Sequence, residues 1–479
     1  LGLEEGSFST EVPFLVEPPA GLPEAGGAVS RAELERRVLD SDQLEQWLDM
    51  QKAYSTALAF ERGEGLPEAL RHYAAGARAW HREQWSVAAP YFSKAAEQRG
   101  EARNPWPLMG EYMRARGHAR VALMADDLTA DSKAREAAEK AMAGFVATRE
   151  RVRADEPDPL RLSVASLGEQ ARLLKRLGRL QEAIQLYAEQ AALGSDSGRQ
   201  SVFFMTRWAR TQPEALEAFL DFPLGRELLV LYAYTHFPSS SVTRDNEAWS
   251  AYRHQNELGD ERVGFRDVFE QILTRLESLP PEQLPATDRL AALLYRQGHF
   301  ERAERTVALA DSPLADWVRA KLALRNDQPD QAAEYFNRAM RGFDGVYWDA
   351  TNYRRDMRKP ACLIATEASL LALSRNELTR SLKLMLEADA VYWLDAAYLA
   401  DHVLTVDELV EVAETMHWED ADRSRVFYFE GQPLYRPSRR HQFETLVGRR
   451  LMRAGRYEEA IEVFPFGVQR ENARRYADL

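Results

Sequence analysis

The chain has 479 residues, of which 45% are hydrophobic and 29% charged, and its formal net charge at pH 7 is −13. This acidity opposes nonspecific binding to nucleic acid, which requires a net basic face. The single cysteine, Cys362, excludes an internal disulfide and a thiolate metal cluster, and its neighbours Ala361 and Leu363 predict a buried small residue.

The first 29 residues predict an extended segment, because Pro18, Pro19, Pro23 and several glycines oppose regular helix. The chain starts at Leu1 and not at Met, as expected after removal of an export signal or after trimming of a longer chain. We therefore expect a bacterial periplasmic or cell-envelope location, with the cytoplasm as the alternative.

Residues 30–198 predict a first series of helical hairpins. Ser30 and Glu33 have the spacing of a capping box, so the first helix is expected to begin there. A long helix is expected from Asp131 to Arg153. Few segments of the chain alternate with period two, which indicates an all-α protein.

Residues 167–187 predict a helix, a tight turn and a second helix, and looser copies recur along the chain. In each copy a small residue is followed by Ala twelve positions later, a larger apolar residue four further on, and often a last Ala three beyond. Small residues suit close helix crossings, and Gly178, Gly298 and Gly455 are expected to end first helices in the left-handed conformation. The copies are Gly76, Ala88, Phe92 and Ala95; Ala171, Ala183 and Tyr187 with Gln190 in place of the last Ala; Ala291, Ala303, Val307 and Ala310; Ala320, Ala332, Phe336 and Ala339; and Gly448, Ala460 and Phe464.

This pattern resembles the tetratricopeptide-repeat family, whose unit is a helical pair of 34 residues. Gly76 and Gly110 stand 34 residues apart, and Trp106, Met109 and Gly110 are similar to the opening residues of that family. The resemblance covers about five hairpins, roughly a third to a half of the chain. It implies a right-handed superhelical α-solenoid with irregular insertions.

The chain also departs from that family. Asp126 stands where the second-helix aromatic residue is expected, and Ala303 and Ala332 are only 29 residues apart. Residues 199–341 predict middle repeats with a loop excursion, and residues 342–479 predict C-terminal repeats with two insertions. The final residues predict one helix without a hairpin partner.

The resemblance implies a binding groove lined by the first helix of each hairpin. Positions one, four and five after the small residue would face it. Arginine and lysine there suit carboxylates or phosphates of a peptide or ligand, or they offset the negative end of the helix dipole. The groove positions include Arg172, Lys175, Arg176, Tyr295, Arg296, Lys321, Leu324, Arg325, Arg449, Met452 and Arg453, and the stripe is interrupted at Leu370, Leu373 and Ser374.

Aromatic residues beside arginines mark the insertions. Trp348 and Tyr353 predict either interface anchors for a partner or rings folded back onto the scaffold. His417, Glu419 and Asp420 stand beside Trp418 and fit an interhelical turn better than a metal site.

The sequence contains none of the standard catalytic or cofactor-binding motifs. Residues 194–198 have Asp196, not Ser, between their glycines and predict a loop in place of a nucleophile elbow. No phosphate loop or dinucleotide glycine motif is present, so we expect no cofactor and no enzyme activity. The longest apolar run, Leu228 to Tyr234, is too short to cross a membrane.

The leading hypothesis is therefore a noncatalytic scaffold that binds a protein or peptide partner, without nucleic acid, through its groove or its insertions. Two alternatives stay open. The first is a polysaccharide-handling envelope enzyme, since the chain resembles in outline the superhelical domain of soluble lytic transglycosylases; the separate catalytic domain of those proteins, with its essential Glu, has no counterpart here. The second is a structural subunit of a larger complex, including a membrane complex. The sequence leaves the oligomeric state open.

Overall fold

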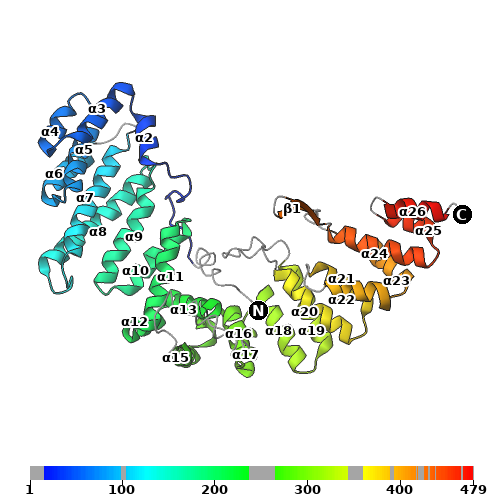
Figure 1. The fold of residues 1–479 in the computed structure, drawn as a ribbon. Coiled ribbons are helices and arrows are strands. Elements are labelled where there is room, and N and C mark those ends of the chain that lie inside the picture. The colour runs from blue at the N-terminus through cyan, green and yellow to red at the C-terminus, as the bar shows by residue number, and fades with distance from the viewer. Residues whose placement is uncertain are drawn as a thin grey trace. The chain divides into compact units, whose positions relative to one another are not determined.

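The computed structural model describes residues 16–98, 104–236, 265–343, 360–388, 393–416, 418, 425–429, 432–436, 438–464 and 468–477. Only the backbone is described for residues 211, 235–236, 265–268, 425–429, 432–436 and 468–469. These residues contain 24 α-helices, which pack mainly against their neighbours in sequence, and one pair of strands (Figure 1). They divide into two compact units, which we call the N-terminal unit (16–286) and the C-terminal unit (287–477).

The described residues of the N-terminal unit form helices joined by turns, apart from residues 16–30 at its start. A short 3₁₀ turn, Pro281–Gln283, follows its last α-helix. Its helices are α2 (Arg31–Val38), α3 (Ser41–Lys52), α4 (Thr56–Arg62), α5 (Glu68–His81), α6 (Trp85–Glu97), α7 (Trp106–Leu123), α8 (Ser132–Arg153), α9 (Leu162–Arg176), α10 (Leu180–Ala192), α11 (Asp196–Thr211), α12 (Pro213–Leu220), α13 (Pro223–His236) and α15 (Phe265–Glu277).

The C-terminal unit continues the succession of helical pairs. A π-helical turn, Leu399–Val403, directly follows α22. Its elements are α16 (Thr287–Arg296), α17 (Phe300–Val307), α18 (Pro313–Arg325), α19 (Pro329–Gly342), α20 (Pro360–Ser374), α21 (Leu378–Glu387), α22 (Trp393–Tyr398), α23 (Val406–Thr415), β1 (Arg425–Phe429), β2 (Gln432–Arg436), α24 (Arg439–Arg453), α25 (Tyr457–Val463) and α26 (Val468–Ala477).

The predicted small residues lie where paired helices meet most closely. A Cβ atom added to Gly76 in α5 would lie 2.8 Å from the Phe92 ring in α6. At the equivalent position in α24, a Cβ on Gly448 would lie 2.6 Å from the Phe464 ring. A side chain at either place would push the two helix axes apart. The spacing that predicts the hairpins therefore reflects direct contacts between the paired helices. Both hairpins are confirmed.

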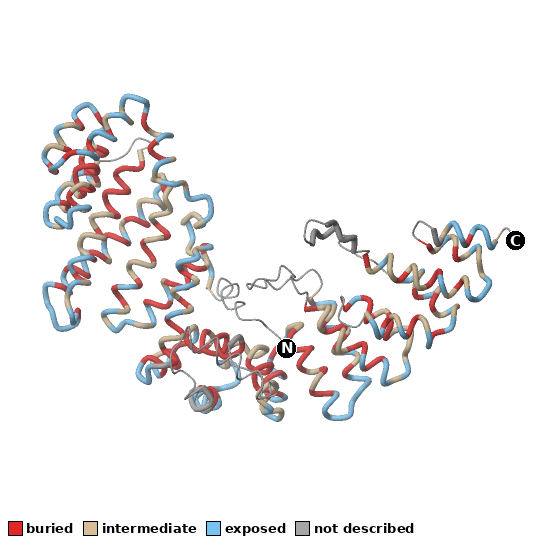
Figure 2. The backbone as a smooth tube through the Cα atoms, viewed as in Figure 1, coloured by how far each residue is buried: buried red, intermediate tan, exposed pale blue. Residues whose placement is uncertain are grey.

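The turns between paired helices also follow the prediction. Gly178, Gly298 and Gly455 have φ angles of 74°, 84° and 77°, a region that favours glycine. Pro213 and Pro223 are the first residues of α12 and α13, where a missing N–H costs nothing. Along the helices, buried residues alternate with exposed ones, and most turns are exposed (Figure 2).

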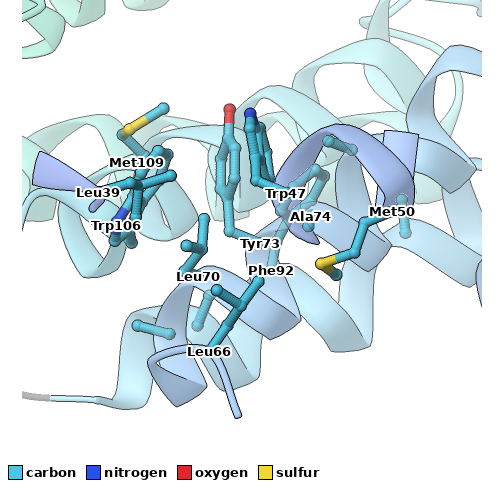
Figure 3. Close-up of a cluster of buried hydrophobic side chains, with 14 of the residues drawn as sticks. Leu39, Trp47, Met50, Leu66, Leu70, Tyr73, Ala74, Phe92, Trp106 and Met109 are labelled. Carbon is cyan, nitrogen blue, oxygen red and sulfur yellow. The ribbon is translucent and has the colours of Figure 1, made fainter. Parts of the chain in front are cut away.

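Aromatic residues fill the core at the start of the N-terminal unit (Figure 3). The ring centroids of Trp47 and Trp106 are 5.7 Å apart, and Tyr73 lies 5.6 Å from Trp106. The guanidinium of Arg31 lies 5.4 Å from the Trp47 ring centroid. Because these rings come from α3, α5 and α7, their burial joins successive hairpins into one core.

Three features differ from the sequence expectations or refine them. The last insertion contains an antiparallel hairpin, in which Arg425 pairs with Arg436, so the chain is not purely helical. Cys362 is half-buried, not fully buried as predicted. The final helix α26 packs against α25, where Tyr476 stacks on Tyr457 with ring centroids 5.8 Å apart.

Candidate functional site

Three first helices, α7, α9 and α11, lie side by side in the N-terminal unit (Figure 1). A cavity of about 400 Å³ opens between them, and we call it the α9 cavity. Most of its walls come from α9 and from both ends of the α10–α11 turn. Its lining residues are Ala25, Tyr112, Arg161, Val164, Ala165, Gly168, Glu169, Arg172, Tyr187, Gln190, Ser195, Ser197 and Ser201.

The start of α9 is fixed by a buried carboxylate. Asp158 accepts hydrogen bonds from the backbone N–H groups of Leu162 at 2.7 Å and Ser163 at 2.9 Å. Arg161 precedes the helix with φ at 57°, uncommon for a residue with a side chain, and its Nη1 donates to the Asp158 carbonyl at 2.9 Å. The capping loop thus holds the Arg161 guanidinium at the rim of the α9 cavity.

Gln190 is the buried polar residue of this cavity. It is 5% exposed, and its Oε1 atom accepts no hydrogen bond within the described part of the chain. A Cβ atom on Gly168 would lie 2.6 Å from that oxygen, so the glycine in α9 makes the room that the amide occupies. Other hairpins have alanine here, as at Ala95 and Ala339. A buried amide oxygen without a donor is costly unless a ligand supplies one.

Two tyrosines add hydroxyl groups to the cavity. Burial raises the pKa of Tyr112, and burial also raises the pKa of Tyr187, against a smaller opposing effect of Arg172. Both phenols therefore remain protonated at neutral pH. Neither hydroxyl forms a hydrogen bond to another described residue, which leaves both available to a ligand carbonyl or carboxylate.

Arg172 is the exposed cation of the α9 cavity. It forms no ion pair within the described ranges. The neighbouring Glu169 is engaged elsewhere, because one of its oxygens lies 3.3 Å from Arg116 Nε in α7. The side chains that α11 contributes to this wall include Ser197 and Ser201, which carry no charge. A guanidinium in this setting suits an incoming carboxylate.

The other predicted groove residues of α9 contact neighbouring parts of the N-terminal unit. Arg176 Nη2 donates to the carbonyls of Ala125 at 2.7 Å and Asp126 at 3.1 Å, in the turn before α8. Lys175 Nζ lies 4.7 Å from the Trp208 ring centroid, and burial lowers its pKa. Both residues lie in the last turn of α9, where a cation also offsets the helix dipole.

In the C-terminal unit, the predicted cations contact neighbouring helices. Lys321 Nζ lies 2.6 Å from Glu367 Oε1 in α20, and Trp317 Nε1 donates to the other oxygen of the same carboxylate at 2.7 Å. Arg325 lies over the Phe300 ring, 3.6 Å from its centroid. Arg296 is half-buried in the last turn of α16.

Of the two arginines predicted for the groove in the last repeat, Arg453 is engaged and Arg449 is available. Arg453 forms an ion pair with Asp401, and this hydrogen bond lowers the pKa of the carboxyl group. Arg449 is exposed and has no ion pair among the residues described. Trp348 and Tyr353, predicted as anchors, lie outside the described residues, as do His417, Glu419 and Asp420.

A second cavity, of about 460 Å³, differs from the α9 cavity because most of its polar side chains already have partners. It lies between α9, α10 and the start of α13. Three of its polar residues already have partners: Gln170 accepts from Arg149 at 2.5 Å, Glu182 pairs with Arg179 at 2.6 Å, and Gln185 donates to Glu189 at 3.0 Å. The α9 cavity is therefore the better candidate site, because a buried acceptor and an exposed cation there have no partner among the residues that the structure describes.

Sequence reasoning found Arg172 but missed most of the residues around it. Gln190 was visible as the residue that replaces the usual alanine. Tyr112, Arg161 and Ser201 gave no signal, because their meeting depends on the packing of three hairpins.

No described group of histidine, cysteine, aspartate and glutamate side chains is arranged to hold a metal ion. None of the described helices is long and apolar enough to cross a membrane.

Comparison of the chain with protein-family models gives no match, and no curated protein sequence matches it.

Proposed function

We propose that this chain is a noncatalytic scaffold similar to tetratricopeptide-repeat proteins, a right-handed superhelical solenoid whose α9 cavity binds an extended peptide of a partner protein. Helices that pack in sequential pairs support the repeat architecture. Repeat arrays of this kind commonly use an extended wall of helices for binding.

The observation that carries the proposal is that the α9 cavity contains a hydrogen-bond acceptor and a cation without partners among the described residues. Gln190 Oε1 is buried without a donor, and Arg172 has no carboxylate partner among the described residues. A peptide in extended conformation presents a main-chain N–H for the amide oxygen, and an acidic side chain for the guanidinium. The hydroxyls of Tyr112 and Tyr187 then donate to peptide carbonyls.

The test begins with selection of peptides from a random display library on the full chain. Labelled peptides that bind are then titrated by fluorescence anisotropy against the Arg172→Glu variant. We expect binding to weaken by about tenfold to a hundredfold, because a charge-assisted hydrogen bond contributes about 1.5–3 kcal/mol and a repulsive charge replaces it.

Two control variants make this result specific. Arg449→Glu changes an exposed arginine at the equivalent position of the last repeat, and Arg135→Glu changes an exposed arginine on α8. Both are expected to bind the peptides as the native chain does. Loss of binding in Arg449→Glu with retention in Arg172→Glu would contradict the proposal, as would a library that yields no binding peptide.

A further inference from the structure

Residues 16–29, which we call the strap, follow the N-terminal unit without forming a helix or strand, and the backbone turns at residues 20–21 and 26–27 (Figure 1). Two backbone hydrogen bonds fix the segment. The N–H of Ala25 donates to the carbonyl of Leu193 at the end of α10, at 2.7 Å, and the N–H of Val29 donates to the carbonyl of Pro159 at 3.0 Å. The strap thus joins the turn after α10 to the turn before α9.

Two arginines of the unit donate to carbonyl groups of the strap. Arg153 Nε, at the end of α8, donates to the Ala20 carbonyl at 3.2 Å, and Arg161 Nη2 donates to the Gly26 carbonyl at 3.4 Å. Carbonyl oxygens are present in every peptide. Donors aimed at them recognise a peptide backbone without regard to its side chains.

The apolar contacts supply the selectivity that these hydrogen bonds lack. Leu22 and Ala25 pack against a small separate cluster made by Val164, Leu167 and Leu193. This cluster is distinct from the two larger cores of the first hairpins. Leucine and a small residue three positions later are therefore the side chains that this surface accepts.

The composition of the strap suits a replaceable ligand. Pro18, Pro19 and Pro23 restrict the free chain to extended conformations, so little conformational entropy is lost when it docks. Gly21 has φ at 71°, and a Cβ atom there would lie 3.2 Å from the Arg153 side chain. The strap contributes no helix or sheet pairing, in contrast to the hairpins on which it lies.

We infer that the end of α8, the loop at 154–161, α9 and the end of α10 form a docking surface for a proline-containing peptide with the turned backbone of the strap, and that the strap is its intramolecular occupant. A partner segment with leucine and a small residue three positions later replaces the strap. This surface adjoins the α9 cavity at Ala25 and shares Arg161 and Val164 with it, whereas Arg153, Leu167 and Leu193 belong to the strap surface alone. The inference stands whether or not Arg172 binds a peptide.

The test uses a synthetic, fluorescently labelled peptide of residues 16–29 and the full chain. The native chain is compared with a Leu22→Asp variant, whose own strap docks poorly because a buried contact becomes charged. We expect the variant to bind the free peptide at least tenfold more tightly than the native chain does, because its surface is vacant. A Glu24→Lys variant, changed at an exposed strap position, is expected to behave as the native chain.

Matched peptides and a second variant keep the result interpretable. The peptide with Leu22→Asp is expected not to bind, and Arg153→Ala in the Leu22→Asp chain is expected to weaken binding about threefold to tenfold. Circular dichroism verifies that each variant is folded. Equal binding by the native and Leu22→Asp chains, or no binding by a folded Leu22→Asp chain, would overturn the inference. A doubling of mass in the native chain that Leu22→Asp abolishes would also overturn it, since a second copy would then be the occupant.

Discussion

Lys321 and Arg172 stand at equivalent positions on first helices of the two units, and among the described residues only Lys321 pairs with a neighbouring helix. In the C-terminal unit, Lys321 pairs with Glu367 at 2.6 Å, and Arg453 pairs with Asp401. In the N-terminal unit, Arg172 occupies the position equivalent to Lys321 and forms no ion pair with any described residue. The repeat pattern thus determines where a cation stands, and the neighbouring helix determines whether that cation supports the scaffold or stays available.

Both units have a glycine that packs closely against a phenylalanine ring of the paired helix. The first prediction tests whether this packing is equally important in the two units. Substitution of Gly76 or Gly448 by leucine inserts a side chain where a single Cβ would already lie within 2.8 Å of a phenylalanine ring. We expect each change to lower the free energy of unfolding of its own unit by about 3 kcal/mol. Hydrogen exchange followed by mass spectrometry locates the loss in one unit or the other.

The control for this prediction is Gly117→Ala in α7. The nearest atom to a Cβ there is Trp80 Cζ3, at 4.0 Å, which is an ordinary contact. This change is expected to be neutral or slightly stabilising, because alanine favours helix. If Gly448→Leu were tolerated and Gly76→Leu were not, the two units would not share one packing rule.

The second prediction concerns the engaged cation of the C-terminal unit. Glu367→Ala removes the acceptor that Lys321 and the indole N–H of Trp317 share. The Lys321 side chain is only 17% exposed, so its charge is left poorly solvated. We expect a loss of about 2 kcal/mol in the free energy of unfolding, measured by urea denaturation.

Arg172→Ala is the matched change in the N-terminal unit. It is expected to alter stability by less than about 0.5 kcal/mol, because no ion pair with a described residue is lost. Equal effects of Glu367→Ala and Arg172→Ala would remove the distinction between an engaged and an available cation.

The third and smallest effect is a pH dependence in the N-terminal unit. Burial, with a smaller contribution from Lys94, lowers the pKa of His72 in α5, and burial likewise lowers the pKa of His118 in α7. The unfolded chain therefore takes up protons near the ordinary histidine pKa of about 6.5, before the folded chain does. Stability is complete above that pH and is lost as the pH falls through the lower folded pKa.

This dependence is measured as the urea midpoint between pH 7.5 and 5. We expect His72→Phe to flatten the decline, since Phe60 lies 4.9 Å from the His72 ring and an apolar ring suits the same place. A native midpoint that rises on acidification would contradict the stated direction. An unchanged slope in the variant would show that His72 does not contribute.

The hairpins were largely predictable from sequence because their spacing reflects direct contact. Ala183 and Tyr187 are buried as predicted, and Gly178 has the expected left-handed backbone. The strands at 425–436 were predicted only as part of an insertion. Glu430 and Gly431 separate them in the sequence, a two-residue spacing that does favour a hairpin.

A residue of the candidate site was predictable only where its distance from a repeat position fixes its place on a helix. Arg172 follows from its distance to Ala171, and Gln190 is visible as a departure from alanine. Tyr112 and Arg161 reach the same cavity through the packing of successive hairpins, which one-dimensional periodicity does not encode. The strap was predicted to be extended, but its backbone turns at residues 20–21 and 26–27. Its docking was not predicted, since its arginine partners lie more than 130 residues away.

That separation has a consequence for how the N-terminal unit folds. Hairpins in a linear array assemble from neighbouring contacts and can add one at a time. The strap connects Ala20 to Arg153, 133 positions apart, so its bonds form only after α8 to α10 are in place. Closing this large loop makes the early hairpins gain or lose order together with the later ones. The unit should therefore unfold as one cooperative block, and not fray from its first helix.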